Sequence, residues 1–177
     1  MRIIAGKLGG LTFESPRSHK THPMSEKIRG ALFNSLGDIS GLSVFDAYGG
    51  SGAVGLEAAS RGASKVLITE IDYIATKIIS DNIAKLGAGD YVTLVRANAA
   101  SYSVKNPDVK FSIVICDPPY DAVVHNQILQ LGTSVEKDGL LVLSLPDSFK
   151  SYILDGFELV QRKNYGDATL VFQRKIC

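Results

Sequence analysis

Short runs of apolar residues recur along the chain, and most are separated by stretches with the length or the period of a helix. This alternation predicts parallel β-strands joined by crossover helices. The runs at 112–116 and 140–145 are continuously apolar, as expected when helices cover both faces of a sheet. The sequence therefore predicts an α/β fold with a buried sheet. The predicted strands are residues 43–47, 65–69, 91–95, 111–116 and 140–145.

The stretches between these strands carry apolar residues at helical spacing. Glycines at three points stand where the ends of helices are expected, because glycine readily adopts the left-handed conformation that closes a helix. Gly62, Gly87 and Gly132 occupy these points. The predicted helices are residues 53–60, 73–86 and 123–131.

Both ends of the chain depart from this alternation. After Pro146, two strand-like runs flank an Asn-Tyr-Gly-Asp turn at 164–167, which predicts a hairpin that closes the sheet with an antiparallel strand. A chain of 177 residues holds one well-buried core. We therefore expect a main domain, residues 41–177, with a small N-terminal extension of hairpin and helix, residues 1–40. The terminal elements are the strands 2–5, 11–13, 157–162 and 169–173 and the helix 25–36.

Positive charge is concentrated at the front of the chain. Residues 1–30 hold six Lys or Arg against two Glu, a net charge of +4, whereas the other 147 residues hold 13 against 16, a net charge of −3. This division fits a polyanion-binding arm on a neutral body, and it fits equally a solvated terminus that is basic by chance. The six residues are Arg2, Lys7, Arg17, Lys20, Lys27 and Arg29.

Cysteine and histidine placement limits the chemistry that the chain can perform. Cys116 lies inside an apolar run and Cys177 is the last residue, so neither a disulfide framework nor a C-x-x-C metal pattern is present. His19, His22 and His125 show no metal-ligand spacing. No apolar stretch reaches the roughly 18–20 residues of a membrane span, and the start lacks the apolar core of a signal peptide. We expect a soluble, cytoplasmic monomer without a metal or a membrane partner.

A glycine-rich turn follows the first predicted strand. Residues 48–52 read Tyr-Gly-Gly-Ser-Gly, and backbone without Cβ atoms lets a ligand approach closely. Residues 50–55 also satisfy G-x-G-x-x-G, but this pattern does not choose between a nicotinamide dinucleotide and S-adenosylmethionine. Asp46 favours S-adenosylmethionine, because a carboxylate beside the turn repels a pyrophosphate and attracts the ammonium of a methionine moiety.

Polar side chains at the next two strand ends complete the predicted cofactor site. Glu70 ends the second strand, where a carboxylate can accept both ribose hydroxyls, although a surface acid is the plainer interpretation. Asn98 follows the third strand and can form a hydrogen bond with the adenine amine. The predicted cofactor-binding residues are Asp46, Tyr48, Gly49, Gly50, Gly52, Glu70, Ile71, Asn98 and Ala99.

The fourth predicted strand ends in Asp117-Pro118-Pro119-Tyr120, the most specific motif of the chain. Two prolines remove two amide donors and stiffen the turn, so neighbouring carbonyl oxygens stay free to accept from a ligand. The Asp117 carboxylate and the Pro118 carbonyl can hold the exocyclic NH2 of a nucleobase with a lone pair toward a sulfonium methyl, and Tyr120 can stack on the base. We predict these four residues as the catalytic site of an amine methyltransferase; the alternative is a proline-rich loop that only caps a strand.

With both motifs in place, the sequence resembles the RsmD-type 16S rRNA guanine-N2 methyltransferases over nearly its whole length. The matching segments, taken together, are far more specific than any one motif. They are residues 2–6, 28–34, 45–63, Glu70, Asn82, 117–120 and 165–167.

The resemblance implies a Rossmann-like class I methyltransferase fold, with a seven-stranded, mostly parallel sheet and helices on both faces. It implies S-adenosylmethionine as the methyl donor and the N2 amine of a guanine in 16S rRNA, carried by a small-subunit particle, as the acceptor. It also implies that the front of the chain engages RNA, with Arg2, Lys7, Arg17, Lys20, His22, Lys27 and Arg29 as candidate contacts. Three departures stand out: His22-Pro23-Met24 replaces the usual Arg-Pro-Thr, Gly30 replaces Glu, and Ser144 stands where an acid often follows the fifth strand.

Three other functions remain open on the sequence alone. A DNA methyltransferase acting on adenine N6 or cytosine N4 would use the same Asp-Pro-Pro-Tyr chemistry, but such enzymes usually carry a region that reads base edges, and 177 residues leave little room for it. A nicotinamide-dependent oxidoreductase would use the G-x-G-x-x-G turn, but no hydride-transfer residues follow it. A non-catalytic RNA-binding module would not need the catalytic tetrapeptide.

Overall fold

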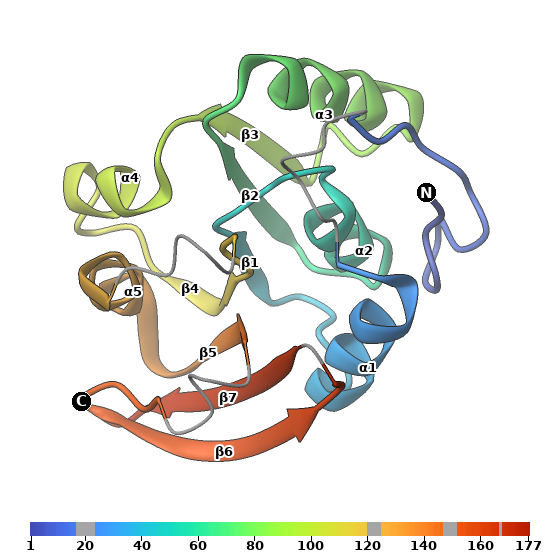
Figure 1. Ribbon diagram of the computed structural model, residues 1–177. Coiled ribbons are helices and arrows are strands. Elements are labelled where there is room, and N and C mark those ends of the chain that lie inside the picture. The colour runs from blue at the N-terminus through green and yellow to red at the C-terminus, as the bar shows by residue number, and fades with distance from the viewer. Residues whose placement is uncertain (17–23, 120–124, 147–151, 167) are drawn as a thin grey trace.

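A seven-stranded sheet of order β3-β2-β1-β4-β5-β7-β6 forms the centre of the computed structural model (Figure 1). The structure describes residues 1–16, 24–119, 125–146, 152–166 and 168–177. Strands β1 to β5 are parallel, and β7 runs antiparallel to both β5 and β6. The predicted mostly parallel sheet is therefore confirmed. The strands are β1 (Ser43–Asp46), β2 (Lys65–Glu70), β3 (Val92–Arg96), β4 (Phe111–Cys116), β5 (Val135–Leu145), β6 (Phe157–Asn164) and β7 (Thr169–Lys175).

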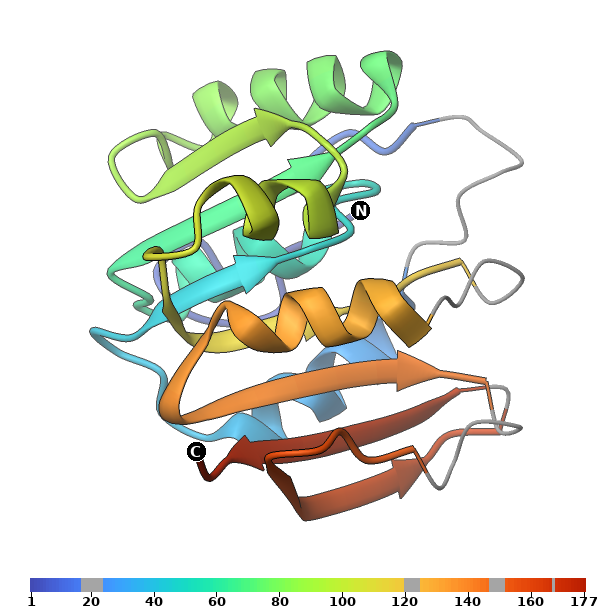
Figure 2. The same cartoon turned by 90° about the vertical axis from the view of Figure 1, so that its left-hand side faces the viewer.

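Helices cover both faces of this sheet (Figures 1 and 2). Each face has its own apolar core, because successive residues of a strand point to opposite sides: Val44 belongs to one core and Phe45 to the other. On the first face lie α1 (Glu26–Leu36), α2 (Ala53–Ser60) and α3 (Tyr73–Lys85), and on the second lie α4 (Ala99–Lys105) and α5 (His125–Thr133).

Local capping explains where three of the helices begin. In each, the side chain of the capping residue accepts a hydrogen bond from the backbone N–H three residues further along the chain, which has no partner within the helix. The capping residues are Ser25, Asp72 and Asn98. Predicted and observed bounds agree to within a residue or two for most elements. Helix α4 was not predicted, because its seven residues are too few for a clear periodic pattern.

Helix α5 ends one residue beyond Gly132, but Gly132 does not adopt the left-handed conformation expected of a glycine that closes a helix. It is buried within the last turn, and a Cβ atom there would lie 3.0 Å from Leu154 Cδ1. The glycine is needed for close packing of the helix against Leu154 and Phe157, and not for a left-handed turn. Strand β5 also begins earlier than predicted, at Val135, which pairs with Phe111 of β4. The register shifts between Val135 and Leu140, and the polar residues there interrupt the apolar pattern from which the strand was predicted.

The N-terminal hairpin, in which Arg2 pairs with Thr12, is attached to α2 by a buried carboxylate. Glu57 of α2 accepts the backbone N–H groups of Ile4 and Ala5 at 2.7 and 3.1 Å. At the tip, Gly6 has φ +85°, and a Cβ atom there would lie 1.9 Å from the Ser60 carbonyl oxygen. The chain reverses as the predicted hairpin requires, but the strands expected at 2–5 and 11–13 are reduced to the single bridge between Arg2 and Thr12. Ile3 and Phe13 join the same core as α1 and α2. The division at residue 40 stays a prediction.

Candidate active site

The glycine-rich turn and the Asp-Pro-Pro corner lie side by side at the carboxyl edge of the sheet. Strand β1 pairs with β2 on one side and with β4 on the other, so the chain order reverses there. In open α/β sheets the crevice at such a reversal is the usual ligand site. Asp46 stands opposite Ile115 in register, and the N–H of Ala47 donates to the Ile115 carbonyl at 3.0 Å. The two motifs thus meet, although 71 residues separate Asp46 from Asp117.

Asp46 lies beneath the glycine turn instead of projecting from it. Its side chain is 1% exposed, and Oδ2 accepts the Gly55 N–H at 2.9 Å. Burial raises the pKa of Asp46 to about 7, against the opposing effect of hydrogen bonds from the Gly55 and Tyr48 backbone. The turn itself requires glycine, since Gly50 and Gly52 have φ of +54° and +78°. Asp46 therefore orders the turn and places a titratable negative charge under it.

A small pocket opens between the tips of β1, β2 and β3. Apolar, amide and carboxylate groups meet in it, the chemical types that a nucleoside moiety needs for its base and its ribose. Five of the predicted cofactor-binding residues line it together: Tyr48, Glu70, Ile71, Asn98 and Ala99. The lining is completed by Ala47, Thr69 and Ala97.

Glu70 and Asn98 are both engaged with backbone groups. Glu70 Oε2 accepts the Gly50 N–H at 2.7 Å, and Oε1 accepts the N–H groups of Ile71 and Asp72 at 2.8 Å each. Oε2 therefore keeps one lone pair for a ligand hydroxyl. Asn98 Oδ1 accepts the Ser101 N–H at 3.0 Å as the cap of α4. Both side chains are thus held in place at the mouth of the pocket before any ligand binds.

Asp117 stands at the tip of β4 as a half-buried carboxyl group. Burial raises its pKa to about 6, and a hydrogen bond with the Ser144 side chain acts in the opposite direction. Ser144 belongs to β5, the neighbouring strand, and is buried. In the sequence Ser144 stands out only because an acid is usual there, and the structure shows that its side chain forms a hydrogen bond with the Asp117 carboxyl group. Pro118 is buried and Pro119 is exposed, whereas Tyr120 lies outside the described residues.

Side chains of α5 and of the segment before β6 face this corner. The Tyr48 hydroxyl donates to Gln127 Oε1 at 3.1 Å. The Tyr152 hydroxyl shares a hydrogen bond of 2.5 Å with His125 Nδ1. The pKa values of Tyr48 and Tyr152 are raised by burial and also by the nearby Cys116. Sequence reasoning did not find Gln127 or Tyr152, since neither belongs to a motif.

The predicted RNA-binding residues are distributed over different parts of the molecule. Lys27 is exposed in the first turn of α1, and Arg2 forms a 3.0 Å ion pair with Glu26 beside it. The ammonium of Lys7 lies 3.4 Å from the centroid of the Tyr91 ring, just before β3 begins. Lys7 is therefore at the amino edge of the parallel strands, opposite the Asp117 corner. Arg17, Lys20 and His22 lie outside the described residues.

The prediction that Arg29 contacts a phosphate is wrong for this structure. Its side chain is 0% exposed, with Nε 3.6 Å from Glu57 Oε2 and Nη2 donating to the Arg2 carbonyl at 2.6 Å. Burial lowers the pKa of Arg29, while the charge of Glu57 raises it. A phosphate would have to displace the hairpin to reach this guanidinium. Arg29 instead joins α1, the hairpin and α2.

The described part of the chain holds neither a candidate metal cluster nor a helix that could cross a membrane. Within 1–16, 24–119, 125–146, 152–166 and 168–177, no three His, Cys, Asp or Glu side chains are grouped closely enough to hold a metal ion. Over the same ranges, every helix is too short or too polar to cross a membrane.

Comparison with known proteins shows similarity over the whole chain. Residues 1–174 match the family model described as Conserved hypothetical protein 95. "Ribosomal RNA small subunit methyltransferase D" of Escherichia coli is 35% identical over 121 residues, 68% of this chain and 60% of that protein, so the match spans less than two thirds of that relative. "Putative rRNA methyltransferase YlbH" of Bacillus subtilis is 24% identical over 99% of both chains. The solved structure "Putative methyltransferase yhhF" from Escherichia coli has a TM-score of 0.87 and 26% identity, covering 100% of this chain and 98% of that one. The fold is that of the class I methyltransferases.

Proposed function

The chain belongs to the family described as Conserved hypothetical protein 95, and from this premise we propose that it is an S-adenosylmethionine-dependent rRNA methyltransferase. The finer proposal is that the acceptor is the N2 amine of a guanine in 16S rRNA. The observation that carries it is the adjacency of the Asp117-Pro118-Pro119 corner to the glycine turn after β1. This arrangement allows a methyl donor and a planar base to meet at neighbouring strand tips.

The pocket residues fit the proposed methyl donor. Oε2 of Glu70 has a free lone pair for a ribose hydroxyl, and the apolar Ile71 offers a surface for adenine. Gly50 leaves room at the turn, since the nearest atom to a Cβ built there is 3.9 Å away. Asp46 lies beneath the turn as a carboxyl group whose pKa burial raises to about 7, and its ionised form would favour the cationic methionine end. The donor itself supplies an electrophilic methyl group.

The chemistry at the acceptor requires positioning more than a strong base. The Asp117 carboxylate and the Pro118 carbonyl each accept one hydrogen of the amine, which fixes the nitrogen and directs its lone pair. The nitrogen becomes acidic as it gains the methyl group and then loses a proton to Asp117 or to water. A pKa of about 6 leaves Asp117 mostly ionised at pH 7, yet close enough to neutrality to take up that proton.

Two observations favour RNA over DNA as the carrier of the base. Two of the similar proteins carry the names of ribosomal RNA methyltransferases. The described residues form one sheet with its covering helices and a small hairpin, which leaves no separate unit for reading base edges in a duplex groove. A base within a duplex must leave its stack to be methylated, so an exposed guanine in a folded RNA is the less costly target.

The proposed function is tested by methyl transfer from a tritiated donor. The protein is incubated with small-subunit particles, naked 16S rRNA and DNA, and the labelled polymer is digested to nucleosides. We expect N2-methylguanosine from an rRNA substrate. Label in N6-methyladenine or N4-methylcytosine of DNA would refute the proposal, and label in another RNA nucleoside would refute the finer part.

The variant Asp117→Ala tests the role proposed for Asp117. We expect it to abolish methyl transfer and to change donor affinity much less, because Asp117 contacts the acceptor amine in this scheme. An equal loss of transfer and of donor binding would instead assign Asp117 to the donor or to the fold.

A further inference from the structure

The three most exposed large apolar side chains of the described residues lie within four positions of one another. Ile71, Tyr73 and Ile74 are 64%, 64% and 66% exposed, at the junction of β2 and α3. Exposed apolar surface gathered at one place is typical of a binding site. Ile71 already belongs to the proposed cofactor pocket, so the surface around Tyr73 is the part without an assigned role.

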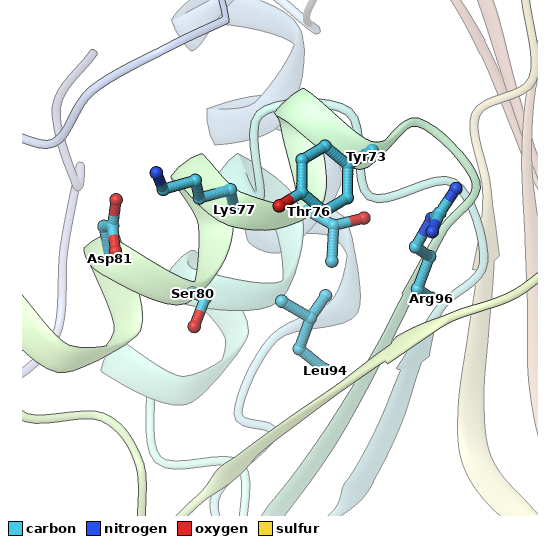
Figure 3. Close-up of a pocket in the computed structure, with 7 residues that line it drawn as sticks. All are labelled: Tyr73, Thr76, Lys77, Ser80, Asp81, Leu94 and Arg96. Carbon is cyan, nitrogen blue, oxygen red and sulfur yellow. The ribbon is translucent and has the colours of Figure 1, made fainter.

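Tyr73 stands at one end of a groove between α3 and β3, with a volume of about 520 Å³ (Figure 3). Because β3 is the outer strand of the sheet, the groove is open to solvent along its length. Tyr73 and Arg96 lie together at one end and Asp81 lies at the other (Figure 3). The groove is lined by Tyr73, Thr76, Lys77, Ser80, Asp81, Leu94 and Arg96.

The Arg96 end of the groove has the chemistry that binds single-stranded RNA. The guanidinium carbon of Arg96 lies 5.4 Å from the centroid of the Tyr73 ring, and its Nε makes only a long contact of 3.4 Å with the Ile71 carbonyl. Aromatic rings and guanidinium planes are the surfaces on which unpaired bases stack. The exposed Arg96 also supplies a cation for the adjoining phosphate, whereas the ammonium of Lys77 points toward the Asp81 end of the groove (Figure 3). The carboxylate of Asp81 is at the far end, so it repels a phosphate only there.

This end of the groove opens on the edge of the sheet that carries the proposed active site. Arg96 pairs in register with Glu70, and the residues that follow it, Ala97 to Ala99, line the cofactor pocket. The tips of β3 and β4 are three strand spacings apart, which corresponds to about 14 Å. A nucleotide near the target base can therefore reach the groove while that base is held at Asp117.

We propose that the groove between α3 and β3 is a binding site for an unpaired nucleotide that flanks the target base in the RNA substrate. The base stacks on Tyr73 and Arg96, and the phosphate is bound by the Arg96 guanidinium. The inference rests on the proposed function for the identity of the polymer. It extends that function by adding a substrate contact away from the reacting atoms.

The test compares variants of the groove in the methyl-transfer assay. Tyr73→Ala should raise the KM for RNA about tenfold with little change in kcat, because stacking in such sites commonly contributes about that much. Tyr73→Phe should behave as the unchanged protein, because it keeps the ring. Arg96→Ala should raise the KM and reduce its dependence on salt. Arg162→Ala is the matched control, since Arg162 is equally exposed on β6, the opposite edge strand.

Donor affinity and direct RNA binding separate the outcomes. Donor affinity should be the same in all variants; a fall in Tyr73→Ala would assign the groove to the cofactor and overturn the inference. An unchanged KM for RNA in Tyr73→Ala and Arg96→Ala would overturn it as well. Should the unchanged protein transfer no methyl group to any RNA, the proposed function fails. Binding of a labelled single-stranded oligoribonucleotide then tests by itself whether the groove binds RNA, and equal affinity of all variants would refute the inference.

Discussion

The buried cluster around Glu57 should dominate the stability of the N-terminal part of the molecule. Glu57 is 0% exposed and accepts two backbone N–H groups of the hairpin, while Arg29 and Arg61 lie 3.6 and 2.8 Å from its oxygens. In Glu57→Gln the shape is kept, but Arg29 is left as a buried cation without a counter-charge. Breaking a buried ion pair on one side costs about 3–5 kcal/mol. For a domain of this size, that corresponds to a fall in Tm of about 6–20 °C.

Urea and thermal unfolding of three variants test this reasoning. Arg61→Met is the comparison variant, because the Arg61 side chain is 16% exposed against 0% for Arg29, and Glu57 keeps Arg29 as a partner when Arg61 is lost; this variant should therefore cost less than Glu57→Gln. The double variant Glu57→Gln with Arg29→Met removes both charges and should be more stable than Glu57→Gln alone. A loss below about 1 kcal/mol in Glu57→Gln, with no recovery in the double variant, would refute the argument.

The remaining predictions concern pH and charge. The kcat/KM for methyl transfer should fall as the pH drops through about 6, since Asp117 must be ionised, and Ser144→Ala should move the midpoint upward because the hydrogen bond that lowers the pKa is lost. Burial raises the pKa of Asp46 in the folded protein to about 7, so the folded state binds a proton there more tightly than the unfolded chain does. The contribution of Asp46 to the stability of the folded protein is therefore fully present below about pH 4 and is lost as the pH rises through 7. The unfolding free energy of Asp46→Asn, relative to the unchanged protein, should therefore increase from pH 4 to 8, and a constant difference would contradict this. Lys27→Glu should weaken RNA binding and flatten its salt dependence, whereas an unchanged slope would remove α1 from the interface.

Charge is the property that sequence reasoning used least accurately. The sequence alone does not distinguish Arg29 from the other cations near the front of the chain, such as Arg2 and Lys27. In the structure Arg29 is buried against Glu57, whereas Arg2 and Lys27 are exposed. A single sequence does not show which cation faces a carboxylate from another helix, because that depends on the packing of α1 against α2. Ser144 illustrates the same point, since its contact with Asp117 exists only because β4 and β5 are neighbours.

The strands of the sheet, most of its helices and the two motifs can be predicted from the amino-acid sequence. These features depend on the periodicity of neighbouring residues, on glycine at positive φ and on proline without an amide hydrogen, all of which act locally along the chain. The strand order, and with it the meeting of the Asp46 turn and the Asp117 corner, becomes known only from the folded chain. The same is true of the burial of Arg29 and of the groove beside Tyr73, because contacts between distant segments depend on how the helices pack on the sheet.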